Sequence, residues 1–208
     1  MILKNYYWLF EKIIPDGICD DIVRLAKSYD SKLGIIGDMK REDLVNDKDK
    51  LKKLKDYRNS NVIWLKERWI WNLLEPLVRV ANTKSGWNFQ WDQSEPCQFT
   101  LYDKGQHYDW HSDCFSGAYN TPGEQTHNKI RKITTMLMLS NSSDYEGGEF
   151  QMDLNHKDKT KDKNILTVDY SEKGTVICFP SFMFHRVKPV KKGTRYSMPT
   201  WHLGNPFM

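Results

Sequence analysis

Apolar residues recur at helical spacing in two segments of the first part of the chain. The first segment follows a short predicted strand at residues 6–15, and Asp16 is a candidate N-cap. Its apolar face consists of Ile18, Ile22, Leu25 and Ala26. The second segment predicts a helix over residues 66–81, and the core face of this helix consists of Ile70, Leu73, Leu74, Leu77 and Ala81. Because Pro76 lacks an amide hydrogen, we expect a kink or two short helices there.

Residues 31–57 lie between these two helices and are dense in charges of both signs. Large apolar side chains are sparse in this segment, so the sequence predicts a mobile loop with one solvated helical turn at most. Two interpretations stay open: a solvated surface with no further role, or a lid that closes over a substrate.

Strand signals prevail from residue 87 onward, and one further strand precedes the second helix. Apolar and polar residues alternate in short runs that glycine, proline and asparagine separate. The predicted strands are residues 58–65, 89–91, 97–102, 131–139, 146–150, 165–169, 175–180, 183–188 and 194–201, together with the stretch that ends at Asp113. The run 131–139 is apolar on both sides, so we expect a central strand there. Residues 114–130 predict a loop, and residues 157–163 predict a charged hairpin tip.

A helical front followed by many short strands favours a mainly β fold with helical support, in the α+β class. The strand spacing is typical of a helix-backed β-sandwich or jelly roll. We expect a single domain over residues 1–208, with a helix-rich front at residues 1–86 and a β core at residues 87–208. Three tryptophans are expected in the core: Trp64, Trp69 and Trp71.

The composition is that of a folded globular protein. Of the 208 residues, 39% are hydrophobic and 13% are aromatic, which is enough for a core and too much for a disordered chain. The net charge of +4 is spread over many residues of both signs. Because nucleic-acid-binding domains concentrate basic residues in a stripe, we expect no nucleic-acid partner.

Several features indicate a cytoplasmic protein. Residues 1–10 lack the apolar run and the cleavage site of a signal peptide, and no apolar stretch approaches transmembrane length. The four cysteines are far apart and form no Cys-x-x-Cys pair, as expected for reduced thiols. We therefore expect a cytoplasmic protein without a membrane partner, while the oligomeric state stays open.

The stretch from Tyr102 to Asp113 contains the first candidate for chemistry. In an extended strand alternate side chains share a face, so His111 and Asp113 are expected to point the same way. Two histidines and one carboxylate that leave other positions of the metal open are typical of non-haem Fe(II) oxygenases. The second histidine must come from elsewhere in the chain, and His185 is the candidate.

Two separated stretches, residues 99–113 and 131–201, resemble the metal and co-substrate motifs of prolyl 4-hydroxylase-like Fe(II)/2-oxoglutarate dioxygenases. The resemblance implies a double-stranded β-helix, which is a jelly-roll or cupin-like fold. It implies Fe(II), 2-oxoglutarate as co-substrate and O2, with ascorbate as a further candidate. The implied reaction is hydroxylation of a substrate C–H bond, foremost that of a prolyl residue in a peptide or protein, with release of succinate and CO2.

The resemblance also assigns roles to individual residues. His111, Asp113 and His185 correspond to the metal ligands. Arg195 corresponds to the residue that binds the distal carboxylate of 2-oxoglutarate, as a guanidinium can with two parallel hydrogen bonds. Further co-substrate contacts are Tyr102 and Thr134, although Thr135 matches equally well, and the residues that line the substrate pocket are Tyr108 and Trp201.

The residues between His185 and Arg195 predict how these two side chains meet. Pro189 and Gly193 bracket a candidate hairpin turn. The strand that carries Arg195 is therefore expected to return beside the strand that carries His185.

Two other functions stay open. The chain could hydroxylate another residue or a small molecule, while demethylation of a nucleobase is disfavoured because a base-reading motif is missing. A protein of a different class, a cupin-like module that binds a metal or ligand without turnover, need not keep the complete set of four residues. Because His111, Asp113, His185 and Arg195 are all present, the sequence favours the oxygenase.

Overall fold

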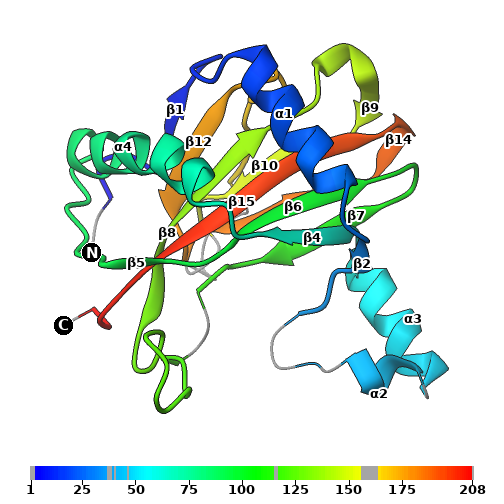
Figure 1. Cartoon of the computed structure of the whole chain (residues 1–208), viewed down its shortest axis with the longest axis horizontal. Helices are drawn as coiled ribbons and strands as arrows, with labels where there is room; N and C mark the ends of the chain where they lie inside the picture. The colour runs from blue at the N-terminus through cyan, green and yellow to red at the C-terminus, as the bar shows by residue number, and fades with distance from the viewer. Residues whose placement is uncertain are drawn as a thin grey trace.

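The structure is a computed structural model that describes residues 3–36, 39, 41–45, 47–114, 117–155 and 164–207. The predicted hairpin tip at residues 157–163 lies outside the described residues, as do residues 37, 38, 40 and 46 of the charged segment. Two antiparallel sheets face each other, and helices cover the outer face of the larger one (Figure 1). No helix in the described part of the chain is long and apolar enough to cross a membrane.

The larger sheet has eight strands. Its hydrogen-bonded order is β1 (Trp8–Phe10), β12 (Val176–Pro180), β8 (Ile130–Met138), β15 (Arg195–Gly204), β6 (Cys97–Tyr102), β4 (Asn61–Leu65) and β2 (Lys32–Leu33), and β5 (Gln93–Ser94) pairs with β15. The central position of the predicted strand 131–139 is confirmed, because β8 lies between β12 and β15.

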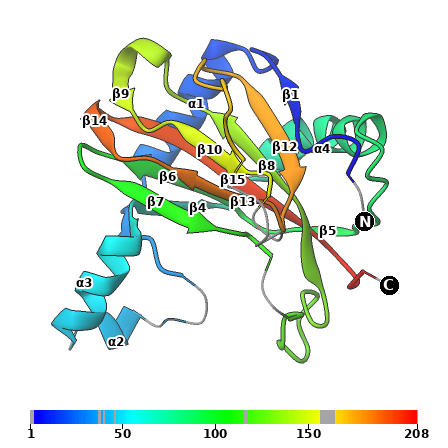
Figure 2. The same cartoon turned by 180° about the vertical axis from the view of Figure 1, so that it is seen from behind.

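The smaller sheet has five strands and lies behind the larger one in Figure 1 and in front of it in Figure 2. Its order is β11 (Ile165–Thr167), β10 (Phe150–Asp153), β13 (Phe184–Val187), β7 (His107–His111) and β3 (Arg58–Asn59). A separate pair consists of β9 (Tyr145–Gly147) and β14 (Val190–Gly193), and a 3-10 helix, η1 (Ser142–Asp144), precedes β9. A mainly β, helix-backed fold is therefore confirmed.

Two apolar clusters hold these layers together. In the first cluster, helices α1 (Asp16–Lys27) and α4 (Arg68–Lys84) pack on the outer face of the larger sheet, where Ile22 and Leu74 meet Leu137. In the second cluster, side chains of the two sheets meet in the space between them, as Met136 and Phe150 do. Because side chains alternate along a strand, β8 and β15 supply both clusters and also line the space between the sheets.

Helix α4 differs from the prediction of a break at Pro76. It runs as one helix of 17 residues with Pro76 inside it. Pro76 is exposed, so water can hydrate the carbonyl group that proline leaves without an amide partner. Asp16 was also assigned wrongly: Pro15 is the N-cap residue of α1, and Asp16 is the first residue of the helix with no side-chain cap bond.

The charged segment at residues 31–57 is more ordered than predicted. It contains β2, α2 (Arg41–Val45) and α3 (Lys48–Tyr57), and Asp47 caps α3 by accepting hydrogen bonds from the amides of Asp49 and Lys50. The two helices stand away from the sandwich in both views (Figures 1 and 2). The sequence missed them because few apolar residues mark a helix with one buried position, Leu54.

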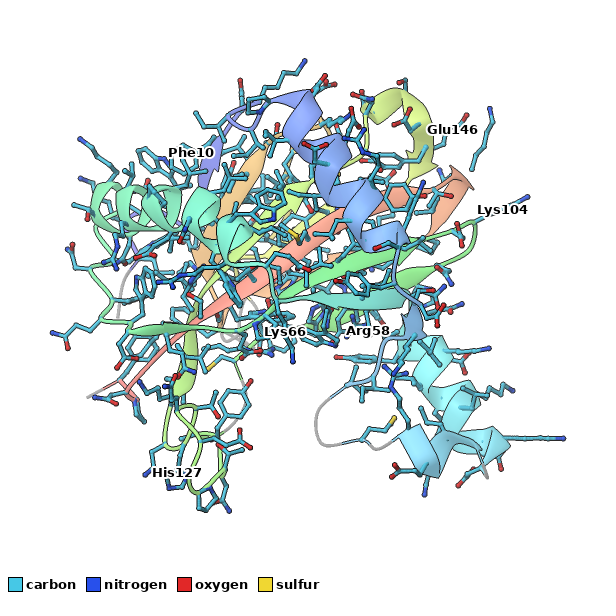
Figure 3. The ribbon with its side chains drawn as sticks, in the orientation of Figure 1. Phe10, Arg58, Lys66, Lys104, His127 and Glu146 are labelled. Atoms are coloured by element: carbon cyan, nitrogen blue, oxygen red, sulfur yellow. The ribbon has the colours of Figure 1, made fainter. Side chains whose placement is uncertain are left out.

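The loop predicted at residues 114–130 is confirmed for residues 117–129, where the structure has no helix or strand. His127 lies in this loop, which extends from the lower end of the sandwich in Figure 3. Two predictions nearby were wrong. Residues 89–91 form no strand, and Trp64 and Trp69 are exposed rather than buried in the core.

Two strand connections also differ from the sequence prediction. Residues 58–65 form two strands in different sheets, β3 and β4, because the chain crosses between the sheets at Ser60. The predicted hairpin is wrong as well: β13 lies between β10 and β7, whereas β15 lies between β8 and β6 of the other sheet. His185 and Arg195 therefore belong to opposite sheets.

Candidate active site

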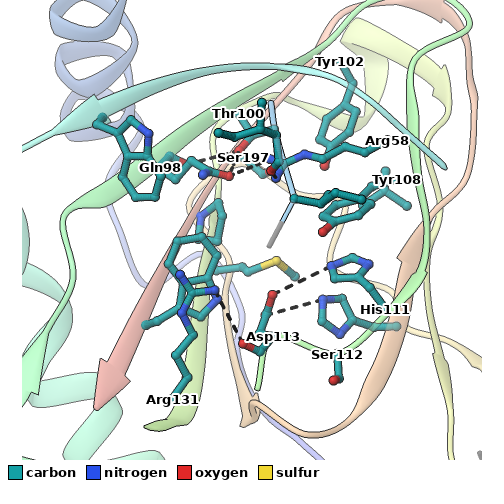
Figure 4. A pocket seen from close by; sticks show the side chains of 18 residues that line it. Arg58, Gln98, Thr100, Tyr102, Tyr108, His111, Ser112, Asp113, Arg131 and Ser197 are labelled. Atoms are coloured by element: carbon teal, nitrogen blue, oxygen red, sulfur yellow. Dashed lines mark hydrogen bonds and ion pairs between the residues drawn. The ribbon is translucent and has the colours of Figure 1, made fainter. Parts of the chain in front are cut away.

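Three side chains that could hold a metal ion converge between the sheets. His111 ends β7, Asp113 follows two residues later, and His185 lies on β13 directly opposite His111. The Nε2 atoms of His111 and His185 lie 3.8 and 3.6 Å from the two carboxylate oxygens of Asp113. One ligand atom from each residue lies within 4.8 Å of the others (Figure 4). All three side chains are nearly buried.

Hydrogen bonds at the far side of each imidazole fix which nitrogen faces the centre. Nδ1 of His111 lies 2.7 Å from the carbonyl oxygen of Asp109, and Nδ1 of His185 lies 2.9 Å from that of Met183. A carbonyl can only accept, so Nδ1 carries a proton in each ring and Nε2 is the nitrogen that faces Asp113. Imidazoles held in this way are oriented to present Nε2 to a metal ion. The donor set therefore fits a divalent metal with two nitrogen ligands and one oxygen ligand.

Asp113 is held in place from behind. Its amide donates to the carbonyl of Ser181 at 2.9 Å, and the hydroxyl of Thr134 donates to its Oδ2 at 2.8 Å. Thr134 lies on the face of β8 that points between the sheets. Thr135 points the other way and forms a hydrogen bond with His202, so Thr134 is the one of the two threonines that lies beside the triad. Thr134 contacts the metal-ligand carboxylate and does not line the cavity described below, so its direct contact with a co-substrate stays a prediction.

The pKa shifts of His111 and Asp113 suit metal binding. Burial, reinforced by the neighbouring His185, holds the pKa of His111 well below its usual value, so this ring is neutral at ordinary pH. Burial alone would raise the pKa of Asp113, but His185, His111 and Arg131 together bring it below its ordinary value. Asp113 is therefore a carboxylate and can supply negative charge to a cation.

The triad opens onto a cavity of about 260 Å³ between the sheets. Three of the residues predicted from the sequence line it: Tyr102, Tyr108 and Trp201. The ring of Tyr108 stacks on His111, with centroids 3.5 Å apart and an angle of 12° between the planes. Trp201 closes another wall beside Trp64, whose ring lies 6.0 Å away. The aromatic residues thus enclose the space next to the metal-binding atoms.

Arg195 is buried and does not line this cavity. Its side chain is fully buried and donates to Ser197 Oγ at 2.9 Å and to the Tyr170 hydroxyl at 2.6 Å. Ser197 lines the cavity of the triad, whereas Arg195 lines an adjoining cavity on the other side. Its Nε has no hydrogen-bond partner among the described residues. The guanidinium therefore has an unused donor, and its hydrogen bond to Ser197 connects it to a residue that lines the cavity of the triad.

The region that carries the site belongs to a known protein family. Residues 97–203 match the model of the 2OG-Fe(II) oxygenase superfamily. The chain belongs to this superfamily. Membership of the superfamily implies Fe(II), 2-oxoglutarate and O2 as the metal and co-substrates. The matched region includes His111, Asp113 and His185, which could hold the metal, and Arg195.

Relatives of this oxygenase are bacterial hydroxylases. A PKHD-type hydroxylase of Psychrobacter sp. is 30% identical over 112 residues, which is 51% of this chain and 37% of the relative. A PKHD-type hydroxylase of Delftia acidovorans is 31% identical over 107 residues, which is 51% of this chain and 42% of the relative. The matched regions thus span only about two fifths of the curated relatives.

Solved structures share the fold of this oxygenase. A Pseudomonas putida prolyl-4-hydroxylase matches with a TM-score of 0.63 at 17% identity, covering 95% of this chain and 91% of that one. A Trichoplax adhaerens prolyl hydroxylase in complex with a hypoxia-inducible factor peptide fragment matches with a TM-score of 0.67 at 16% identity, covering 95% and 83%. The double-stranded β-helix that the resemblance implied is therefore confirmed.

The sequence did not reveal an ion pair at the edge of the oxygenase site. Arg131 donates to both oxygens of Glu95, at 2.7 and 2.6 Å, and its guanidinium lies 3.8 Å from the centroid of the Trp201 ring. Tyr119 donates to the same carboxylate at 2.8 Å. This network ties the loop at residues 117–129 to the wall beside Asp113. No local pattern could predict it, because its members come from separate parts of the chain.

A second arginine at the cavity was also missed. Arg58, Gln98 and Trp64 all line it, on the side of β3, β4 and β6. In the view of Figure 4, Arg58 lies at the upper end of the group of side chains and Arg131 at the lower end, with Asp113 near Arg131. The one signal in the sequence was a charged residue at the start of the predicted strand 58–65, and that signal does not distinguish an inward from an outward side chain.

Proposed function

We propose that this oxygenase hydroxylates a C–H bond of a prolyl residue in a peptide or protein, with conversion of 2-oxoglutarate and O2 to succinate and CO2. The convergence of His111, Asp113 and His185 at one cavity carries the proposal. Two further findings support a prolyl substrate. The curated relatives are hydroxylases, and prolyl hydroxylases share the fold, one of them in complex with a peptide.

In this proposal His111, Asp113 and His185 would hold Fe(II), which would activate O2 as the oxidant for C–H hydroxylation when 2-oxoglutarate is also bound. The hydrogen bonds of the two imidazoles to backbone carbonyls orient the ligands, and Thr134 orients Asp113. The aromatic walls exclude water from the reacting atoms.

The remaining roles concern the organic ligands. Arg195 binds the distal carboxylate of 2-oxoglutarate with the help of the Tyr102 side chain, and the unpaired Nε of Arg195 supports an anion nearby. Tyr108 and Trp201 border the substrate, since both line the cavity beside the triad. Ascorbate would serve to restore Fe(II) after unproductive turnover.

The deciding experiment is an anaerobic titration of Fe(II) and 2-oxoglutarate into the apoprotein, followed by the weak visible charge-transfer band of the chelate. We expect the band in the wild type and its loss in His111→Ala. His127→Ala is the matched control, because His127 lies in the loop at residues 117–129 and is not one of the three converging ligands. A folded protein that gives no band would contradict the proposal.

The prolyl specificity has its own test. Proline-containing peptides are incubated with the Fe(II)-loaded enzyme, 2-oxoglutarate and O2, and mass spectrometry follows the gain of one oxygen atom on proline. Stoichiometric succinate without oxygen on any proline, but with oxygen on another residue or on a small molecule, would keep the oxygenase and reject the prolyl substrate.

A further inference from the structure

The guanidinium of Arg58 is held rigidly at the wall of the cavity. Its Nε donates to Ser60 Oγ at 3.0 Å, Nη1 to the carbonyl of Ile35 at 2.9 Å, and Nη2 to Gln98 Oε1 at 2.8 Å. The ring of Tyr108 lies beneath it, 4.5 Å from Cζ to the ring centroid. These contacts leave two of the five guanidinium N–H groups without a protein partner among the described residues.

The backbone also closes on Arg58. A Cβ atom on Gly34 would lie 2.6 Å from Nε and 2.8 Å from Cζ of Arg58, so only glycine allows this approach. The amide of Gly34 donates to the carbonyl of Ser60 at 2.8 Å, which fixes the same loop to the crossing between the sheets. The position of the guanidinium is thus determined before any ligand binds.

The surroundings of Arg58 are neutral. It is 6% exposed, and within the described part of the chain it forms no ion pair. Arg131, on the other side of the cavity, is by contrast paired with Glu95 at 2.6 Å. Burial of a charge without a partner is costly, and neutral hydrogen bonds offset only part of that cost. A protein that keeps such a charge at a cavity wall gains from it when an anion binds.

In the proposed function, every charge of the site except that of Arg58 is neutralised by a partner or a ligand. Fe(II) and Asp113 together contribute one positive charge, Arg195 contributes another, and the two carboxylates of 2-oxoglutarate offset both. Arg131 is neutralised by Glu95. Arg58 then remains as one uncompensated positive charge beside the substrate, and a substrate with one carboxylate would neutralise it.

We propose that Arg58 is a specificity-determining residue that binds a carboxylate of the primary substrate, so that the oxygenase selects acidic substrates. This inference rests on the proposed function and adds the chemical class of the substrate. The two free N–H groups bind the carboxylate, and the indole rings of Trp64 and Trp201 border the apolar remainder. The carboxylate belongs either to a small acid or to an acidic side chain next to the modified residue.

The test compares an acid with its neutral isostere. Phenylacetate and phenylacetamide are titrated calorimetrically into the protein loaded anaerobically with Fe(II) and 2-oxoglutarate. We expect the acid to bind more tightly than the amide by about tenfold or more in the wild type, because a charged hydrogen bond is lost in the amide. Arg58→Gln should abolish the preference, and Arg58→Lys, which keeps the charge, should restore part of it.

Two further variants separate the charge from its position. Gly34→Ala leaves Arg58 in the chain but displaces its guanidinium, so it should also reduce the preference for the acid. Arg24→Gln removes an arginine whose side chain is 75% exposed on α1, and it should leave the preference unchanged. Equal binding of the acid and its neutral counterpart by the wild type, both for the phenylacetate pair and for the peptide pair described next, would overturn the inference, as would a preference that persists in Arg58→Gln.

A second arm of the experiment uses the capped dipeptides acetyl-Pro-Glu-amide and acetyl-Pro-Gln-amide. A glutamate preference that depends on Arg58 identifies an acidic peptide, whereas a preference seen for phenylacetate alone identifies a small acid. Loading with Fe(II) and 2-oxoglutarate is recorded first on the same sample. Failure of that step contradicts the proposed oxygenase, while the acid preference of Arg58 is still measured on the apoprotein.

Discussion

At the scale of single residues, the site depends on side chains that touch the metal ligands without binding a metal. Thr134 is the clearest case, because its hydroxyl lies 2.8 Å from Asp113 Oδ2 and 3.0 Å from Ser181 Oγ. We expect Thr134→Val to weaken Fe(II) binding by about 10- to 100-fold, since the carboxylate loses its orienting donor. Anaerobic Fe(II) titration measures this effect.

The result for Thr134 has a matched control. Thr135→Val removes the neighbouring hydroxyl, which bonds His202 on the opposite face of β8. It should lower stability while leaving Fe(II) affinity unchanged in the folded fraction. Equal loss of Fe(II) affinity in both variants would show that Thr134 acts through the fold alone.

A substitution at Arg195 can separate the binding of 2-oxoglutarate from the binding of Fe(II). We expect Arg195→Gln to weaken 2-oxoglutarate binding by about tenfold to 100-fold, because a charge-assisted hydrogen bond to a carboxylate is lost. Fe(II) binding should be preserved, since Arg195 contacts none of the three ligands. Titration of 2-oxoglutarate into the Fe(II)-loaded variant, followed by the charge-transfer band, measures the change. An unchanged 2-oxoglutarate affinity would exclude Arg195 as the anchor.

At the scale of helices and strands, the sequence predicted elements well and their partners poorly. The alternation in β6, the continuous apolar run in β8 and the helical spacing of α1 and α4 were sufficient, because each pattern is local. The pairing of β15 with β8 and β6 depends on contacts distant in sequence, so turn residues at 189 and 193 suggested the wrong hairpin. Contacts between residues distant in sequence are not visible in a local pattern. The triad His111, Asp113 and His185 was therefore predicted only because its motifs resemble those of a known family, and the roles of Arg58 and of the Arg131–Glu95 pair were not predicted.

Helix α4 offers a test at this scale. Pro76 interrupts the backbone hydrogen bonds of a continuous helix and is exposed, so its side chain is not needed for packing. We expect Pro76→Ala to raise the free energy of unfolding by about 1–3 kcal/mol, because a proline inside a helix is unfavourable and its effect on the unfolded chain offsets only part of this. Urea unfolding measures the difference.

Glu75→Ala is the control for Pro76→Ala, because it changes the adjacent residue, which is partly exposed, and removes only its ion pair with Arg79. Such a pair contributes about 0.3–0.5 kcal/mol, so this variant should be close to the wild type. A loss of stability in Pro76→Ala would mean that the helix requires the proline.

At the scale of the whole molecule, polar groups buried between and beside the sheets make stability depend on pH. His202 illustrates this on the outer side of the larger sheet, where its two nitrogens bond Ser94 Oγ at 2.8 Å and Thr135 Oγ1 at 3.0 Å. Burial, followed by the charge of Arg79, lowers the pKa of His202 to about 3. The folded protein therefore keeps this ring neutral across the range in which an unfolded histidine gains a proton.

The consequence is a loss of stability in acid that can be assigned to one residue. Above about pH 6.5 His202 is neutral in both states, and below that pH the unfolded state binds a proton that the folded state excludes. The free energy of unfolding should thus fall by about 2 kcal/mol from this ring between pH 7 and pH 5. Urea unfolding at both pH values measures this fall, and we expect a single transition if residues 1–208 form one domain. His202→Gln should be less stable at pH 7 but lose less stability on acidification, with His111 contributing equally to both proteins. An equal acid-induced loss in wild type and variant would show that His202 is protonated in the folded state.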